Sequence, residues 1–137
     1  MDVKLDNPSL LITDDDRDFR DTLRDAFATR GFRTLTAGDG EEALRIVGRE
    51  PVHLMLLDMH MPRLTGLETM RRIRQMNVML PCILLSAGLN DVLAEEARRA
   101  DVYSVLSKPV RFAEVTSLVH RALRQVYGWP AGERSGG

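Results

Sequence analysis

Residues 52–58 read Val52-His53-Leu54-Met55-Leu56-Leu57-Asp58, a mostly apolar run that ends at a carboxylate. The run is continuous rather than alternating, which is typical of a β-strand buried on both faces. Strands of this kind belong to parallel sheets, because the helices that connect them cover both sides. Asp58 then stands at the carboxyl end of the strand, which is where an open parallel sheet binds its ligands.

Short apolar runs recur on either side of this segment, and helical patterns separate them. Further strands are predicted at Leu10–Ile12, Phe32–Ala37, Cys82–Leu85 and Val102–Leu106. Apolar residues with helical spacing predict helices around Phe19–Phe27, Ala43–Val47, Leu67–Ile73, Leu93–Ala97 and Val115–Val126. Gly31 is the expected C-cap of the first helix, and Asn90 is the expected N-cap of the fourth. This order predicts an α/β fold, a doubly wound five-stranded parallel sheet with helices on both faces.

The composition describes one globular domain without a strong charge bias. The chain has 137 residues, 44% of them hydrophobic, and a formal net charge of −1. That length suits a single core, and the charge gives no reason to expect a nucleic-acid or anionic-membrane partner. No apolar stretch approaches the roughly 20 residues that span a bilayer, and Met1–Asn7 lacks the apolar core of a signal peptide. We expect a cytoplasmic domain that binds neither membrane nor nucleic acid directly.

The folded domain is expected to occupy residues 8–127. Residues 1–7 form an N-terminal extension in this interpretation. Residues 128–137, which are rich in glycine and have no apolar periodicity, form a flexible tail or a truncated linker. No internal repeat of fixed period adds to the alternation of strands and helices.

Side chains suited to chemistry follow four of the five predicted strands. In chain order they are Asp14-Asp15-Asp16, Asp58, Ser86-Ala87 and Lys108-Pro109. Because the carboxyl ends of parallel strands meet at one edge of the sheet, we expect these side chains to converge. Lys108 is one of only two lysines in an arginine-rich chain, so its position after a strand is informative.

The residue types at this edge suit phosphoryl transfer beside a divalent metal. Clustered carboxylates repel one another, and a hard cation such as Mg²⁺ relieves that repulsion. A carboxylate can also act as a nucleophile and form an acyl phosphate, while an ammonium and a hydroxyl stabilise the charge of the transferred group. Each motif alone is more often a turn or a helix cap. Their joint occurrence at four strand ends favours transfer to Asp58.

With these motifs in place, the chain resembles the receiver domain of response regulators, the CheY-like module of two-component signalling. The resemblance covers residues 8–127, and each of its motifs is weak alone, whereas the ordered set is highly specific. The motifs are Leu11-Ile12-Thr13-Asp14-Asp15-Asp16 with Arg20, Leu56-Leu57-Asp58-Met59-His60-Met61-Pro62 with Gly66, Leu84-Leu85-Ser86-Ala87 and Leu106-Ser107-Lys108-Pro109. The resemblance implies the flavodoxin-like form of the predicted (βα)5 fold.

For the metal, the resemblance implies a Mg²⁺ or Mn²⁺ ion held by Asp14, Asp15 and Asp58. Asp15 is the expected direct ligand, and Asp14 is expected to act largely through water. The backbone carbonyl of His60 should complete the protein's share of the metal shell. The side chain of His60 is interpreted as an exposed loop group without a part in catalysis. Asp16 receives no metal role and is interpreted as the cap of the following helix.

For the phosphoryl group, the resemblance implies that Asp58 is the acceptor. Ser86 matches the switch hydroxyl that turns inward to bond a phosphoryl oxygen, while Ala87 keeps access open and offers a backbone N–H. Lys108 is similar to the lysine that neutralises the group, and the peptide bond after it should be cis. The position three before this lysine is often aromatic in the family and is Val105 here, so we expect a smaller rearrangement than an aromatic ring would give.

The expected function is that of a signalling phosphoacceptor that promotes its own phosphorylation and dephosphorylation, rather than a turnover enzyme. A sensor histidine kinase or a histidine phosphotransfer protein would donate the group, and a downstream effector protein or domain would respond. The possibility that phosphorylation drives formation of a homodimer stays open. Two alternatives are a pseudo-receiver that only makes protein contacts and a metal-dependent phosphatase with an aspartate nucleophile. The complete set of acids, hydroxyl and lysine weighs against the former, and His60, where such phosphatases place an acid, weighs against the latter.

Overall fold

Strands and helices alternate along residues 7–129, the part of the chain that the computed structural model describes. The strands are β1 (Ser9–Thr13), β2 (Arg33–Ala37), β3 (Leu54–Asp58), β4 (Cys82–Ser86) and β5 (Ser104–Ser107). The helices are α1 (Arg17–Ala28), α2 (Gly40–Arg49), α3 (Gly66–Gln75), α4 (Asp91–Arg99) and α5 (Phe112–Tyr127). The predicted order is confirmed. β3 and β5 begin slightly later than predicted, although His53 and Tyr103 already donate backbone hydrogen bonds to β1 and β4.

The five strands form one parallel sheet in the order β2-β1-β3-β4-β5. This is the flavodoxin-like order, in which the winding reverses between β1 and β3. In the register of the sheet, Asp58 lies opposite Leu85 of β4, and Ser86 lies opposite Ser107 of β5. The predicted fold class is therefore confirmed, and the carboxyl ends of β1, β3, β4 and β5 lie along one edge.

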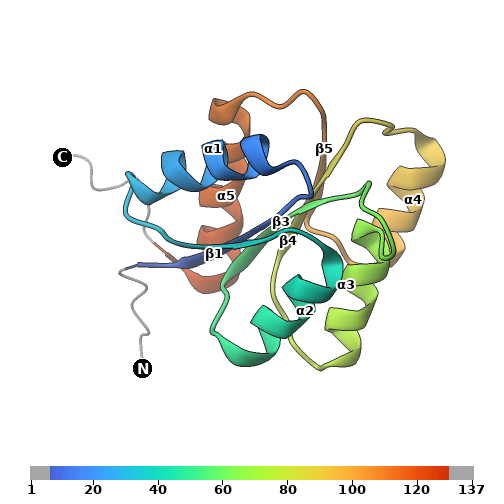
Figure 1. The fold of residues 1–137 in the computed structure, drawn as a ribbon, viewed down its shortest axis with the longest axis horizontal. Coiled ribbons are helices and arrows are strands. Elements are labelled where there is room, and N and C mark those ends of the chain that lie inside the picture. Colours follow the sequence, from blue (N-terminus) through green and yellow to red (C-terminus); the bar gives the residue numbers. More distant parts are fainter. Residues whose placement is uncertain (1–6, 130–137) are drawn as a thin grey trace.

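Alternate side chains of the central strands enter two separate cores. Figure 1 shows α1 and α5 on one side of the sheet and α2, α3 and α4 on the other. The strand residues that pack on the side of α2, α3 and α4 include Leu11, Met55, Leu57, Cys82 and Leu84. Those on the side of α1 and α5 include Leu10, Ile12, Leu54, Leu56, Ile83 and Leu85. Because both sets are buried, each strand reads as a continuous apolar run, and each large side chain stabilises the fold by about 1.5–3 kcal/mol.

Side-chain caps mark the beginnings of four helices, α1 to α4, and two of these caps were predicted. Asp16 and Asn90 each accept a hydrogen bond from the backbone N–H three residues further on, at 3.2 Å and 2.9 Å. Both predicted caps are confirmed.

Gly31 closes the end of α1 as predicted, a few residues past the last helical residue Ala28. Its N–H donates to the Ala28 carbonyl at 3.2 Å, and the Phe32 N–H donates to the Phe27 carbonyl at 3.3 Å, which are the two hydrogen bonds of a Schellman cap. The φ of Gly31 is 90°, a left-handed conformation that glycine adopts readily.

Ordered packing continues past residue 127, into the segment predicted as a tail. Gly128 ends α5 with a φ of 69°, and the Trp129 ring packs edge-on against Phe32, with 5.5 Å between ring centroids. Val126, predicted on the apolar face of α5, is instead half exposed, at 50%. The rest of the predicted tail, residues 130–137, and residues 1–6 of the predicted extension lie outside the described residues.

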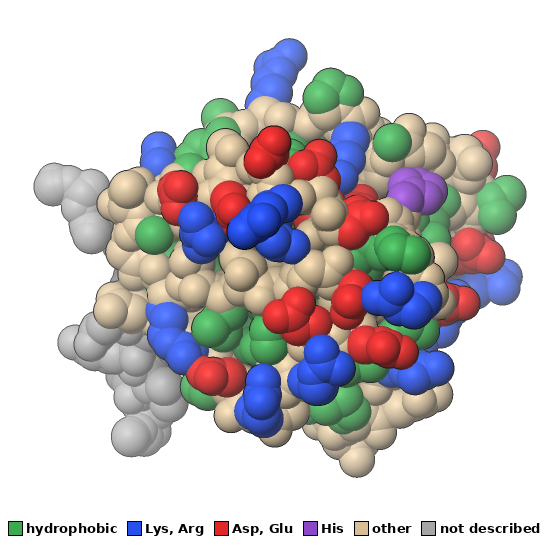
Figure 2. Space-filling model, in the orientation of Figure 1, with side chains coloured by type: hydrophobic (Ala, Val, Ile, Leu, Met, Phe, Trp, Pro, Cys, Tyr) green, Lys and Arg blue, Asp and Glu red, His purple; other side chains and the backbone are tan. Residues whose placement is uncertain are grey.

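Charges of both signs cover the surface that faces the reader in Figure 2. Lys and Arg side chains are interspersed with Asp and Glu over this face, rather than gathered by sign. Within residues 7–129, none of the helices combines the length and the apolar character needed to cross a membrane.

Candidate functional site

Three carboxylates meet where β1 and β3 end. Asp14 follows β1 directly, Asp15 comes next, and Asp58 is the last residue of the neighbouring strand β3. One carboxylate oxygen from each of the three lies within 4.8 Å of the other two. Asp14 and Asp58 are buried, whereas Asp15 is exposed to solvent. The structure therefore brings together the three acids for which the sequence predicts a metal.

Lys108 reaches into this cluster from the end of β5. Its Nζ lies 3.0 Å from Asp14 Oδ2 and 3.2 Å from Asp58 Oδ1. The centroid of the Phe19 ring lies 4.6 Å from the same nitrogen. The peptide bond between Lys108 and Pro109 is cis, as predicted. One ammonium thus contacts both buried carboxylates.

Burial and neighbouring charges shift the titration of these groups. Burial raises the pKa of Asp58, and the charge of Asp14 raises it further, while Lys108 and the backbone N–H of His60 oppose the rise. Burial lowers the pKa of Lys108, but Asp14 and Asp58 outweigh it, so that the pKa lies above its ordinary value. One ammonium therefore compensates two buried carboxylates only in part.

Local structure fixes the two buried acids in place. Asp14 Oδ1 accepts the backbone N–H of Asp16 at 2.9 Å, and Arg20 Nη1 donates to the Asp14 carbonyl at 3.1 Å. At Gly66, the first residue of α3, the backbone passes close to the Asp58 backbone at the end of β3. A Cβ atom at this glycine would lie 2.6 Å from the Asp58 carbonyl oxygen, so the close approach requires glycine.

The donor set of the cluster fits a hard divalent cation. All three side chains offer carboxylate oxygens, which suit Mg²⁺ or Mn²⁺ rather than softer metals. A cation also relieves the partly compensated charge that raises the pKa of Asp58. The exposed position of Asp15 leaves that side of the cluster open to solvent. The predicted role of the His60 carbonyl stays a prediction.

Ser86 and His60 form a contact that the sequence did not predict. Ser86 Oγ is fully buried at the end of β4 and lies 3.1 Å from His60 Nε2. The Gly88 N–H donates to the same oxygen at 3.0 Å. His60 is exposed as predicted, yet its ring has a specific partner. This contact could have been anticipated from the predicted fold, because β3 and β4 are neighbouring strands and the loops that follow them therefore run side by side. Ala87 is exposed at the start of the second loop.

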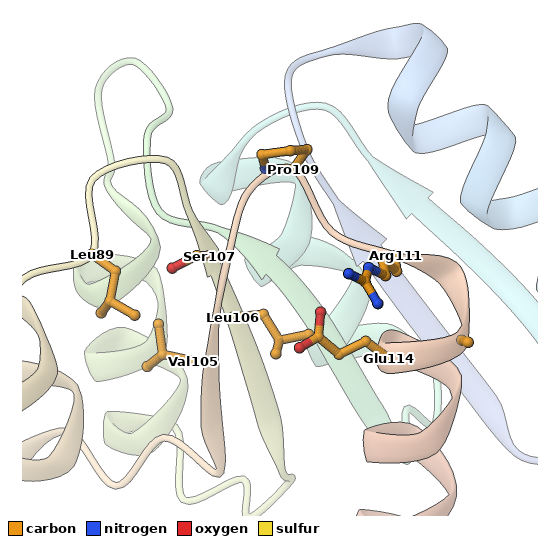
Figure 3. Close-up of a pocket in the computed structure, with 8 residues that line it drawn as sticks. Leu89, Val105, Leu106, Ser107, Pro109, Arg111 and Glu114 are labelled. Atoms are coloured by element: carbon orange, nitrogen blue, oxygen red, sulfur yellow. The ribbon is translucent and has the colours of Figure 1, made fainter.

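A hollow of about 790 Å³ opens beside the site, between β5 and the loop after β4. Figure 3 shows Leu89 and Val105 together at one end of it, with Arg111 and Glu114 at the other. Leu89 is partly exposed, at 39%. Among the described residues that line the hollow, none is aromatic.

Curated relatives match most of this chain but less of their own length. The transcriptional activator protein PfeR of Pseudomonas aeruginosa is 36% identical over 126 residues, which are 90% of this chain and 40% of that protein. The response regulator MprA of Mycobacterium leprae is 36% identical over 118 residues, which are 85% of this chain and 51% of that protein. The chain therefore spans about half, or less, of the length of these relatives.

A solved structure and a family model match the same region. A response regulator receiver protein from Pseudomonas putida superposes with a TM-score of 0.80 at 27% identity, covering 84% of this chain and 97% of that chain. The model of the response regulator receiver domain matches residues 10–120, which include the acids, Ser86 and Lys108. The chain therefore belongs to the response regulator receiver domain family.

Proposed function

We propose that this domain accepts a phosphoryl group on Asp58 in a metal-dependent reaction and relays the change through its protein-interaction surface. The observation that carries the proposal is the contact of Lys108 with both Asp14 and Asp58 within a cluster of three carboxylates. This arrangement combines a nucleophile, an acidic metal site and a fixed cation within one small volume.

In the proposed reaction, a carboxylate oxygen of Asp58 attacks the phosphorus of a phosphohistidine. The new O–P bond forms as the P–N bond breaks, and the electron pair leaves with the donor's imidazole. Lys108 stays beside the attacked phosphoryl group and neutralises its oxygens, so the protein contributes mainly position and charge. A Mg²⁺ ion held by Asp14, Asp15 and Asp58 would neutralise further charge on those oxygens.

The proposed donor is a sensor histidine kinase or a histidine phosphotransfer protein. Membership of the receiver family and the similarity to a protein named as a response regulator support this class of donor. The proposed recipient of the signal is an effector, either a further domain or a separate protein. One relative is named as a transcriptional activator.

Incubation with acetyl phosphate and Mg²⁺ tests the proposal, with intact-protein mass spectrometry as the readout. The wild type should gain one phosphoryl group per chain, and Asp58→Asn should gain none, because an amide cannot form the acyl phosphate. Asp18→Asn is the matched control, since it removes one exposed carboxylate from α1 and should label normally. An unlabelled wild type would indicate a domain that makes only protein contacts. Repeated turnover of phosphate monoesters would indicate a phosphatase.

A further inference from the structure

The hydroxyl of Ser86 already has two hydrogen-bond partners in this structure. Gly88 N–H lies 3.0 Å from Ser86 Oγ, and His60 Nε2 lies 3.1 Å from it. Ser86 is buried, with an exposed fraction of 0%, whereas His60 is exposed. His60 follows Asp58 by two residues, so its ring links the loop after β3 to the loop after β4.

The geometry assigns a direction to the bond between Ser86 and His60. A serine hydroxyl has one proton and two lone pairs, and the Gly88 N–H occupies a lone pair. A buried hydroxyl proton needs an acceptor, and among the hydrogen bonds of residues 7–129 the acceptor offered to it is His60 Nε2. The Ser86 hydroxyl therefore donates to Nε2, and the ring proton lies on Nδ1.

We propose that His60 is a positioning residue that competes with the phosphoryl group for the single proton of Ser86. This inference rests on the proposed function, in which that hydroxyl donates to a phosphoryl oxygen on Asp58. One proton cannot serve both acceptors, so Ser86 has to leave the ring when it turns toward the phosphoryl group. The lost bond reduces the difference in free energy that drives the switch, and His60 thereby lowers the activated fraction.

The loop after β4 is held by the same contact. A Cβ atom at Gly88 would lie 3.7 Å from His60 Nε2, which is an ordinary van der Waals distance, so the loop backbone runs close along the ring. Ser86 anchors the start of this loop through its bonds to Gly88 and His60. Releasing the hydroxyl from the ring therefore also frees the start of the loop that leads to α4.

The hydrogen bond is tested first without any phosphoryl group. Nitrogen NMR of the His60 ring, at about pH 8 and without metal, reports which nitrogen carries the proton. The wild type should carry it on Nδ1. In Ser86→Ala, which removes the donor, the population should move toward the form protonated on Nε2. A wild-type ring protonated on Nε2 would overturn the proposal, whether or not Asp58 accepts phosphate.

The competition is tested with beryllofluoride and Mg²⁺, titrated by backbone amide NMR. His60→Ala should bind beryllofluoride about two- to tenfold more tightly than the wild type, the range expected for one hydrogen bond. His60→Gln, whose amide oxygen can accept the same proton, should bind like the wild type. In a Ser86→Ala background the His60→Ala change should have no effect.

Two outcomes of the titration count against the proposal, and a third counts against the proposed function. Equal tightening in both backgrounds would mean that His60 acts through another group, and no tightening in either would mean that it does not compete. A wild type that fails to bind beryllofluoride at all would refute the phosphoacceptor role of Asp58. The ring tautomer would then still decide whether His60 holds Ser86.

Discussion

The ammonium of Lys108 lies 3.2 Å from Oδ1 of Asp58, so the proposed phosphoacceptor is paired before any phosphoryl group arrives. The same ammonium contacts Asp14 at 3.0 Å. Burial raises the pKa of Asp58, and Lys108 opposes that rise. In the proposed function, Lys108 favours the ionised form of the Asp58 carboxylate and would neutralise the phosphoryl group that Asp58 receives.

Replacing Lys108 should slow phosphorylation. The labelling rate of Lys108→Ala with acetyl phosphate should fall about tenfold or more, because a charge-assisted contact contributes about 1.5–3 kcal/mol. The pKa of Asp58 should also rise further in this variant, so labelling should begin to fail at a higher pH than in the wild type. Arg121→Ala is the control, since it removes one exposed cation from α5. An unchanged rate in Lys108→Ala would contradict the assigned role.

The two neighbouring acids after β1 should differ in their effect on metal binding. Asp15→Ala should weaken Mg²⁺ binding more than Asp14→Ala, because Asp15 is exposed and expected to ligate directly. The Asp14 oxygens are already bonded to the Asp16 N–H and to Lys108. Calorimetric titration measures both affinities. Wild-type affinity in Asp15→Ala would show that the metal binds elsewhere.

Asp16→Ala separates metal binding from stability at the same loop. Its Oδ1 caps α1, so the variant should lose about 1 kcal/mol of unfolding free energy in urea. Its affinity for Mg²⁺ should match that of the wild type, because the sequence and the structure assign it only the cap. A large loss of Mg²⁺ affinity in Asp16→Ala would place this third acid in the metal site.

Two histidines should make the domain less stable in mild acid. Burial lowers the pKa of His53, whose Nδ1 accepts the Ser9 N–H at 2.9 Å. Burial also lowers the pKa of His120, with help from the charges of Arg124 and Arg30. Because the folded-state pKa values lie below the ordinary 6.5, the unfolded chain binds protons first. The free energy of unfolding should therefore fall as the pH drops below about 6.5.

Urea denaturation at about pH 7.5 and about pH 5 measures this loss. The double variant His53→Asn/His120→Gln should lose less stability between the two pH values than the wild type, because it lacks both titrating rings. The asparagine introduced by His53→Asn would retain an oxygen acceptor for the Ser9 N–H. Equal losses in the wild type and the double variant would assign the acid sensitivity to carboxylates instead.

The convergence of functional side chains at the carboxyl ends of the strands was predictable, because it depends on a simple rule of parallel sheets. Continuous apolar runs located the strands, and the order of elements fixed that their carboxyl ends share one edge. That rule alone placed Asp14, Asp58 and Lys108 together, and the structure gives contacts of 3.0 Å and 3.2 Å. The roles of these residues in phosphoryl transfer stay predictions.

The features that escaped prediction depend on the paths of loops. The contact between His60 and Ser86 requires two loops to bring a ring and a hydroxyl within 3.1 Å, and apolar periodicity carries no information about that. Trp129 was assigned to a tail because local sequence shows no pattern there. Its packing depends on Phe32, which lies 97 residues earlier in the sequence.

The last prediction concerns how far a change at Asp58 travels toward β5. Val105 is β-branched, so its χ1 angle is restricted. Its short side chain cannot occupy the volume that an aromatic ring would fill. It faces a hollow of about 790 Å³ that it leaves unfilled, next to the partly exposed Leu89 (Figure 3). Beryllofluoride with Mg²⁺ should therefore shift the backbone amide NMR signals of residues 86–90 strongly and those of residues 102–106 only weakly.

In Val105→Tyr, a ring can enter the hollow as Ser86 turns, so the strong shifts should extend into residues 102–106. Met76→Tyr, at a partly exposed position after α3 and beside Gly48 of α2, is the matched control and should behave like the wild type. Strong shifts at residues 102–106 in the wild type would show that β5 responds without an aromatic ring, and the coupling would then have to run through the backbone of the strand.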